Sequence, residues 1–554
     1  MRLSMARLLS SVVVLGGLLP VAGLLAASLG TADARVDGAK AEQQPAVLGE
    51  ETLVGALTAS GFQVNSGYPI VYQNACRDYT YPALQSCFGN NPVSPYVIPA
   101  VQAWPNEAVG PTPVNTFGPV RPGYMPTYRL DPRDAVVIYG RMPPPGKYMS
   151  VVTYLWTQHG RWKAKDFDLW ARTPNHAPMR YVFSTVPPND PQSERVWSLS
   201  TLGDAVNDQV MRRQSGDPFG KDRYFIITPS AGTDRAVRAV LRAQGIADSD
   251  IFTEQIPRRD DMGPIEPLGM GENAIEFCTF FKYALPDDPA EGREWWTSFA
   301  GANAPLKVLR VRPTPSLGPA ERYDLLTYGE RTARSEAYLA GDMQALVAGV
   351  CDRVGASSDY WSADCTQPPP SSSFFADLVQ DFGWTGPYCR KVNMWCGDQP
   401  DAGLFGTRPL LLDSGEVHAV VATLATETGN ATYVGLSIND ASTYLAPAGL
   451  VDTDLRGSAD GYSSAVNDAD KFFVHFFARD CSAIEPLLPP GRAQDCTEIG
   501  AGMVPKPGDT AAAGDPALMG MFWLGIRDYI APGTERGPDT RKLLRPRILT
   551  FLRR

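Results

Sequence analysis

The sequence predicts an α+β fold in which a disulfide-stapled, sandwich-like antiparallel β core is built from two sequence-distant segments. Three observations support this: apolar strand patterns at 134–156 and 418–438, a β-α-β pattern between them at 222–256, and cysteines that fall into close pairs. Each distant segment contains Ala-Val-Val, then a turn with glycine, then a second apolar run. We therefore expect two β-hairpins that share one core and enclose the middle of the chain.

The first residues resemble an export signal, and we predict a signal peptide over residues 1–34. Arginines precede an apolar run at 8–29, and small residues at 32–34 provide a cleavage point before Arg35. A retained membrane anchor is the alternative, because the apolar run is long enough to span a bilayer. Residues 35–67 are small and polar, and we expect them to form a flexible leader.

The cysteine spacing predicts four local disulfides and one unpaired thiol. Of the nine cysteines, all but Cys278 have a close neighbour in the sequence, which gives the pairs Cys76 with Cys87, Cys351 with Cys365, Cys389 with Cys396, and Cys481 with Cys496. In the chain-entropy model each such loop contributes about 2–4 kcal/mol. Cys278 lies in an apolar run and should be buried. Because disulfides are typical of oxidising compartments, we expect a secreted, periplasmic or cell-envelope protein.

The first half of the chain divides into two predicted parts. Residues 68–190 form a first β-rich segment whose proline-rich stretch at 91–147 should wrap the core as extended loops, since proline disrupts helices and interior strands alike. Residues 191–312 form an α/β insertion around the β-α-β unit. Its helix should be capped by Thr233 or Asp234.

A further helix of this insertion is expected at 201–213, with Thr201 as its N-cap. Its apolar residues recur at helical spacing.

The second half contains a helical and disulfide-rich loop region at 313–405 and a second β-rich segment at 406–484. Residues 485–554 form a C-terminal extension. Within it we expect a helix at 516–530, because Asp515 and Pro516 are favourable at the N-cap and first helical position. A basic tail follows at 536–554.

Composition and motifs exclude several classes of function. The net charge of −10 gives no electrostatic argument for nucleic-acid binding. The chain contains no His-x-x-x-His, Cys-x-x-Cys, Gly-x-Ser-x-Gly, P-loop or EF-hand pattern. A Gly-x-Gly-x-x-Ala match at 269–274 follows prolines instead of a strand, which favours an ordinary glycine loop. We predict no cofactor and no metal.

Two pairs of residues are candidates for sugar chemistry. Glu272 and Glu276 are four apart and would share a helix face, where two carboxylates could act as acid and base on a glycoside. A solvated or salt-bridged helix face is the simpler interpretation. Trp295 and Trp296 could form a stacking platform for sugars, although tryptophan more often packs in a core.

Two other pairs are candidates for anion binding and for base or metal chemistry. Thr233 and Arg235 stand at the start of the β-α-β helix, where an anion could bind; an ordinary capped turn is the alternative. His418 and His475 both fall in predicted strands and could face each other beside Asp413 or Glu416. They could equally be structural histidines of the core.

The function that these observations favour is ligand binding or surface interaction by an exported protein. The partner would be a small molecule or a polysaccharide, with a carbohydrate or a small anion as the ligand. The alternative is a secreted hydrolase whose carboxylates or histidines meet only in three dimensions, and a structural envelope protein is a third hypothesis. We expect no nucleic-acid partner, and membrane contact only through an uncleaved signal segment.

Overall fold

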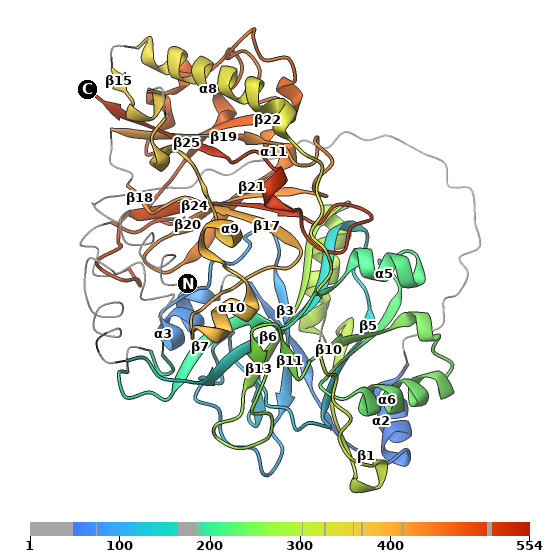
Figure 1. Ribbon diagram of the computed structural model, residues 1–554. Helices are drawn as coiled ribbons and strands as arrows, with labels where there is room; N and C mark the ends of the chain where they lie inside the picture. The colour runs from blue at the N-terminus through green and yellow to red at the C-terminus, as the bar shows by residue number, and fades with distance from the viewer. Residues whose placement is uncertain are drawn as a thin grey trace, which may run out of the picture.

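The computed structural model describes residues 48–554 apart from 74, 164, 166–184, 189, 302, 326–327, 358, 367–368, 412–414 and 507–511 (Figure 1). The predicted signal peptide and residues 35–47 of the predicted leader lie outside these residues. The remainder of the predicted leader, residues 48–67, is not a flexible segment in the structure, because it contains helix α2 (Glu50–Ala59) and strand β1 (Phe62–Ser66). No helix in the described part of the chain is long and apolar enough to cross a membrane.

The first half of the chain forms a sandwich of two sheets. The first outer sheet has the order β1 (Phe62–Ser66), β14 (Leu306–Pro313), β5 (Ala135–Arg141), β9 (Asp222–Thr228) and β10 (Ile251–Gln255). The first inner sheet has the order β2 (Tyr68–Tyr72), β3 (Tyr96–Gln102), β13 (Glu276–Pro286), β6 (Gly146–His159) and β7 (Arg195–Thr201). Two short strands, β4 (Tyr124–Met125) and β8 (Val206–Asn207), pair with β3 and β6.

The second half forms another sandwich, placed above the first in Figure 1. The second outer sheet has the order β15 (Tyr360–Trp361), β25 (Arg547–Arg553), β19 (Glu416–Thr423), β22 (Phe472–Ala478) and β23 (Cys496–Glu498). The second inner sheet has the order β16 (Ala376–Asp377), β17 (Ala402–Gly406), β24 (Met521–Tyr529), β20 (Val434–Asp440) and β21 (Leu445–Val451), with β18 (Leu410–Leu411) beside β24.

The two sandwiches have the same topology. Taken in chain order, ten strands of each half enter the outer and inner sheets in the same sequence and occupy the same positions. In both outer sheets the last pair, β9–β10 or β22–β23, is parallel, and the other pairs are antiparallel. A helix precedes each first strand and packs on the outer sheet: α2 (Glu50–Ala59) in the first half and α8 (Ala340–Gly355) in the second. The chain is therefore a structural tandem repeat.

The fold class predicted from the sequence, α+β with disulfide-linked antiparallel sheets, is confirmed. The two Ala-Val-Val segments are β5–β6 and β19–β20, which occupy equivalent positions in the two sandwiches. The predicted hairpins are wrong, because β5 and β6 lie in different sheets, as do β19 and β20. Each segment crosses from an outer to an inner sheet, so two cores form in place of one that encloses the middle of the chain.

Burial on both faces explains the consecutive apolar residues of these strands. Val136 points into the core between the two sheets of the first sandwich, whereas Val137 packs under the helices that cover the outer sheet. Val420 and Val421 repeat this arrangement in the second sandwich.

The β-α-β unit is present, and it extends the first outer sheet. Parallel strands β9 and β10 flank α6 (Ala231–Ala243), which is capped by Ser230 and not by Thr233 or Asp234. The helix expected at 201–213 begins later, as α5 (Asp208–Ser215), because the Asn207 side chain accepts hydrogen bonds from the backbone of Gln209 and Val210. Thr201 instead ends β7.

The helix predicted at 516–530 is wrong, since Met521–Tyr529 is strand β24 in the middle of the second inner sheet. Phe522, Leu524 and Ile526 point into the core at every second position, the period of a strand. The basic tail is also ordered: Arg547–Arg553 is β25, paired with β15 and β19.

Other elements are α3 (Tyr81–Leu84), β11 (Arg259–Asp260), β12 (Gly263–Pro264), α7 (Pro289–Thr297), α9 (Leu378–Phe382), α10 (Gly386–Lys391) and α11 (Asp452–Leu455).

All four predicted disulfides are present, and Cys278 is unpaired and buried. Burial raises the pKa of the Cys278 thiol well above its ordinary value.

We therefore expect maleimide to label no cysteine of the folded, unreduced protein and Cys278 alone after denaturation without reductant. Peptide mapping by mass spectrometry measures this, and labelling of any of the other eight cysteines would contradict the pairing.

Candidate functional site

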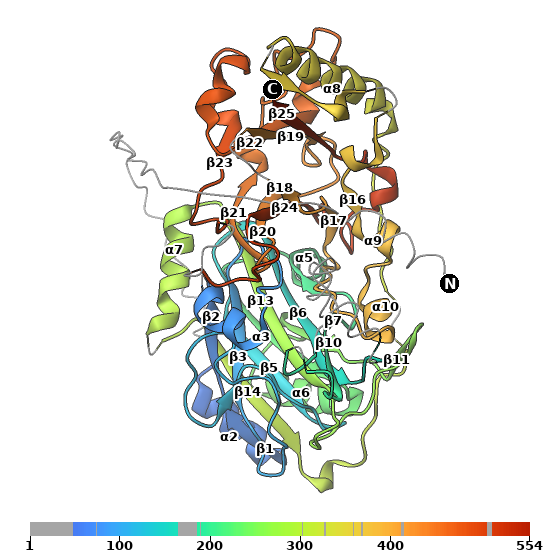
Figure 2. The same cartoon turned by 90° about the vertical axis from the view of Figure 1, so that its left-hand side faces the viewer.

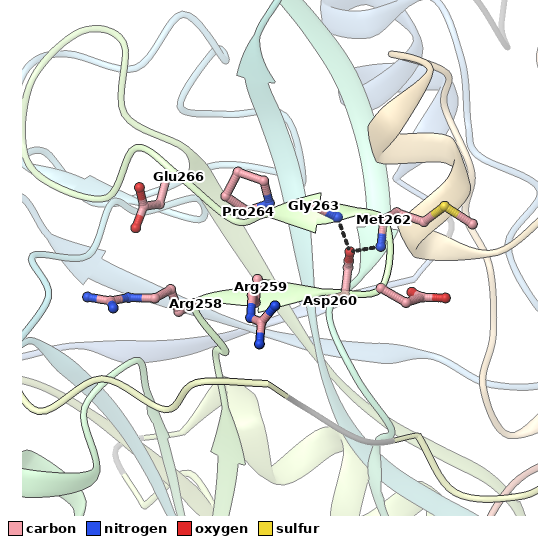
Figure 3. A pocket seen from close by; sticks show the side chains of 8 residues that line it. Arg258, Arg259, Asp260, Met262, Gly263, Pro264 and Glu266 are labelled. Atoms are coloured by element: carbon pink, nitrogen blue, oxygen red, sulfur yellow. Dashed lines mark hydrogen bonds between the residues drawn. The ribbon is translucent and has the colours of Figure 1, made fainter.

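A hollow of about 680 Å³ opens beside the short hairpin formed by β11 and β12. Its lining comes from one continuous stretch of chain, Arg258 to Pro264 together with Glu266 (Figure 3). This stretch directly follows β10, so the hollow lies near the carboxyl ends of the parallel strands β9 and β10. In open α/β sheets, ligands favour this edge of parallel strands.

The Asp260 side chain shapes the turn of this hairpin. Its Oδ1 atom accepts hydrogen bonds from the backbone N–H groups of Met262, at 2.9 Å, and Gly263, at 3.1 Å (Figure 3). An aspartate that bonds the backbone two residues on is typical of a tight turn. Gly263 has a φ of 139°, which glycine adopts without strain.

The arginines Arg258, Arg259 and Arg322, at or near the hollow, differ in their partners. Arg259 is 3.6 Å from Asp324, and Arg322 is 3.4 Å from Glu266. Burial lowers the pKa of Arg322; Glu266 raises it and the nearby Arg258 lowers it further. Arg258 is exposed, and within the described parts of the chain no carboxylate pairs with it.

A segment between β14 and α8 runs along the same edge. The Tyr323 N–H donates to the Pro229 carbonyl at 3.2 Å, and the Tyr323 carbonyl accepts the Arg258 N–H at 2.9 Å. The Ala231 N–H donates to the Glu321 carbonyl at 2.7 Å. The Glu321 carboxylate forms an ion pair with Arg235.

The predicted anion site at Thr233 and Arg235 therefore lies beside a carboxylate of the chain itself, Glu321. Thr233 is buried, and its hydroxyl donates to the Arg133 carbonyl at 2.8 Å. Both residues stand at the start of α6, on the same edge as the hollow but outside its lining.

Glu272 and Glu276 do not share a helix face, because Glu276 begins strand β13 and Glu272 lies in the turn before it. Glu276 is buried and accepts hydrogen bonds from the hydroxyl groups of Thr112, Thr127 and Thr157. Glu272 is exposed. One carboxylate is therefore exposed and the other buried, and the shared helix face expected for an acid and base pair is absent.

His418 and His475 lie on neighbouring strands and point into the core of the second sandwich. His475 pairs across the sheet with Val420, which faces the same way as His418. The ring of His418 bonds the Leu411 carbonyl and the Thr550 hydroxyl, and that of His475 bonds the Thr497 hydroxyl. Burial lowers the pKa of His418 to about 4 and that of His475 to about 3, so both rings are neutral at pH 7. Asp413 lies outside the described residues, and Glu416 begins β19.

Trp295 and Trp296 belong to α7 and pack edge to face, with ring centres 4.8 Å apart. The Trp295 ring is buried against Phe281 and Tyr283, and its N–H donates to the Arg141 carbonyl at 3.3 Å. Trp296 is partly buried against the same cluster.

The contact between the sandwiches contains a buried polar cluster that sequence reasoning missed. The Lys282 ammonium, 6% exposed, donates to the Tyr154 hydroxyl at 2.9 Å. Tyr148 donates to the Asp401 carboxylate at 2.8 Å. Burial lowers the pKa of Lys282 to about 8 and raises that of Asp401 to about 6. These residues are far apart in the sequence, so no local pattern could have indicated them.

This cluster joins the two halves of the chain. Lys282, Tyr148 and Tyr154 belong to strands of the first inner sheet, and Asp401 comes from the second half of the chain. Perturbed pKa values occur both in functional sites and in structural polar networks. Because the cluster is buried and its members bond one another across the contact, we assign it to the docking of the sandwiches.

Among the described residues, no group of three or more His, Cys, Asp or Glu side chains is placed to hold a metal ion. No protein-family model and no curated protein sequence matches the chain. Among solved structures, the chain is similar to the crystal structure of an uncharacterized protein from Burkholderia cenocepacia, with a TM-score of 0.31, 10% identity, and coverage of 90% of this chain and 84% of that one. So weak a likeness says nothing of function.

Proposed function

We propose that the chain is an exported binding protein whose hollow beside β11 and β12 takes a small anionic ligand. Arg258 carries this proposal: its exposed guanidinium lines the hollow, and no carboxylate of the described residues pairs with it. A guanidinium presents a planar fork of donors that matches the two oxygens of a carboxylate or phosphate.

The position and size of the hollow support the proposal. It lies near the carboxyl ends of parallel strands, where ligands favour binding. Its volume of about 680 Å³ is within the range of small-molecule sites. Arg259 can turn from the exposed Asp324 to a ligand, because an exposed ion pair is weak.

Export is supported by the disulfides. Four local disulfides are typical of proteins that fold in an oxidising compartment. A secreted, periplasmic or envelope location therefore remains our proposal, together with the signal peptide at residues 1–34.

The other hypotheses have less support. The hydrolase hypothesis relied on His418, His475, Glu272 and Glu276, three of which are buried and hydrogen-bonded inside the sandwiches. A carbohydrate platform relied on Trp295, which is buried, and on the partly buried Trp296.

Anion binding can be measured by isothermal titration calorimetry of the full chain with inorganic phosphate, citrate and glucose as probes. We expect phosphate or citrate to bind and neutral glucose not to bind. Arg258→Ala should weaken binding at least tenfold, about 1.4 kcal/mol, because the guanidinium contacts the anion. Arg293→Ala, which removes an exposed arginine from α7, is the matched control and should bind as the unmodified chain does. Equal affinities in the two variants, or no binding of either anion, would refute the proposal.

A further inference from the structure

Each sandwich extends an arm that is closed by a disulfide. The first arm, residues 76–92, leaves the first inner sheet between β2 and β3, and the second arm, residues 389–400, leaves the second inner sheet between β16 and β17. Both begin with Cys-Arg. The first ends in Cys-Phe-Gly-Asn-Asn-Pro and the second in Cys-Gly-Asp-Gln-Pro. The arms thus correspond in topology, disulfide and sequence.

The two arms make the same contacts with opposite sandwiches. In the first arm, Cys87 and Gly89 donate their N–H groups to the carbonyls of Thr443 and Tyr444, at 2.7 and 2.6 Å, just before β21. In the second arm, Cys396 and Gly397 donate to Ser198 and Leu199 of β7, both at 2.8 Å. Strands β7 and β21 are equivalent edge strands of the two inner sheets. Figures 1 and 2 both show α10, the helix that leads into the second arm, beside β7.

A side chain of each arm also bonds a tyrosine of the opposite half, in the same way in both directions. Asn91 of the first arm donates to the hydroxyl of Tyr433 in the second half at 3.0 Å. Gln399 of the second arm donates to the hydroxyl of Tyr148 in the first half at 3.1 Å. Each tyrosine stands at or just before the start of its inner-sheet strand, β20 or β6. An exchange of this kind joins the two sandwiches through their equivalent sheets.

The arginines that begin the arms reach the loop that follows the parallel strand of the opposite sandwich. Arg77 donates to the Met503 carbonyl at 3.2 Å, in the segment after β23. Arg390 donates to the Asp260 carboxylate at 2.5 Å and to the carbonyls of Pro264, at 2.8 Å, and Gly263, at 3.3 Å. These acceptors belong to the hairpin that lines the hollow.

We infer that Arg390, a residue of the second sandwich, positions the ligand hollow of the first, so that ligand binding and docking of the two sandwiches are coupled. The inference rests on the proposed function of the hollow. Arg390 is 8% exposed and acts as a positioning residue, since it holds both strands of the hairpin and does not line the hollow. Coupling of this kind is reciprocal: a ligand that favours the held hairpin also favours the docked arm.

The positioning role can be tested without a ligand, by hydrogen–deuterium exchange of the full chain. Arg390→Ala should raise the exchange rates of the amides at 258–266 at least tenfold. The control is Arg77→Ala, which removes the reciprocal arginine: it should raise exchange at 499–504 and leave 258–266 unchanged. If Arg390→Ala does not fold, Arg390→Lys serves instead, because the single nitrogen of lysine cannot replace the two guanidinium nitrogens that bond Pro264 and Asp260 separately. Unchanged exchange at 258–266 in a folded Arg390 variant would overturn the inference.

Calorimetry with inorganic phosphate then tests the coupling. Arg390→Ala or Arg390→Lys should weaken phosphate binding at least threefold, whereas Arg77→Ala should bind as the unmodified chain does. If the unmodified chain binds no phosphate or citrate, the proposed function fails while the exchange result still decides the positioning role. If it binds and the Arg390 variants bind equally well, the coupling is refuted and the proposed function stands.

Discussion

Replacing Glu254 with glutamine should make the first sandwich more stable than the unmodified protein at alkaline pH and equally stable near pH 4. Glu254 lies on β10 and faces inward like Phe252, between the two sheets. It is 7% exposed; its Oε1 atom accepts the Thr153 N–H, and its Oε2 atom is buried with no hydrogen-bond partner. Burial raises the pKa of Glu254 to about 8, so the side chain is a neutral acid in the folded protein at neutral pH.

The sign of the effect follows from proton linkage. Between pH 4.5 and about 8 the folded protein keeps the proton on Glu254, whereas the unfolded chain releases it. Stability therefore falls as the pH rises through this window. A shift of this size corresponds to about 5 kcal/mol when complete. Lys282 favours the ionised form of Glu254 and Asp401 opposes it, and both remain in the glutamine variant.

Hydrogen–deuterium exchange of β9 and β10 from pH 4.5 to 9, corrected for the intrinsic pH dependence of exchange, measures the difference between the two proteins. The curves should meet near pH 4.5 and separate in favour of Glu254→Gln up to pH 8. Glu291→Gln, at an exposed position of α7, is the control and should follow the unmodified protein. Curves for Glu254→Gln that stay parallel to the unmodified protein would show that Glu254 ionises without penalty.

Local features of the sequence predicted local features of the fold. Disulfides between near neighbours, the β-α-β unit and strands buried on both faces all depend on spacing within a short stretch. Strand pairing does not depend on such local spacing. β5 pairs with β14 and β9, far along the chain, and nothing in the two Ala-Val-Val segments shows whether they share a sheet. Their similarity reflects equivalent positions in two repeats.

The helix predicted at 516–530 failed for a different reason. Asp515 and Pro516 are favourable helix-start residues, but in the structure the Asp515 carbonyl accepts a turn bond from Leu518 and the chain then enters β24. The alternation of Phe522, Leu524 and Ile526 with more polar or exposed positions was the stronger signal. The burial of β24 as the middle strand of its sheet therefore outweighed the preference of Asp515 and Pro516 for the start of a helix.

The candidate site could be only partly predicted. Arg258 and Arg259 follow a strand and precede an Asp-Asp-Met-Gly turn, a visible pattern. The residues that complete the arrangement, Arg322 and Arg390, come from distant segments. Both arms begin with Cys-Arg and end with Gly-x-x-Pro, at 89–92 and at 397–400. This shared pattern was present in the sequence and would have indicated the repeat.

The equivalence of the two repeats leads to a prediction about cooperativity. Val137→Asp and Val421→Asp place a carboxylate at matching positions of β5 and β19, each packed between its outer sheet and the covering helix. An unpaired buried charge should destabilise either protein by about 3–5 kcal/mol. The packing around Val137 includes Leu53, Val237 and Leu241, and that around Val421 includes Leu346 and Val350, so no residue is shared.

Each substitution should therefore unfold its own sandwich first. Hydrogen–deuterium exchange should show Val137→Asp losing protection in β5, β9 and β14 while β19, β22 and β25 stay protected, and Val421→Asp giving the reverse. Val109→Asp, at a surface position 85% exposed, is the control and should leave both sets protected. The two disulfide-closed arms work against independent unfolding of the sandwiches, because each arm is bound to the opposite sandwich through Arg77 or Arg390. Simultaneous loss of both sets in either variant would mean that the arms couple the repeats more strongly than the separate cores divide them.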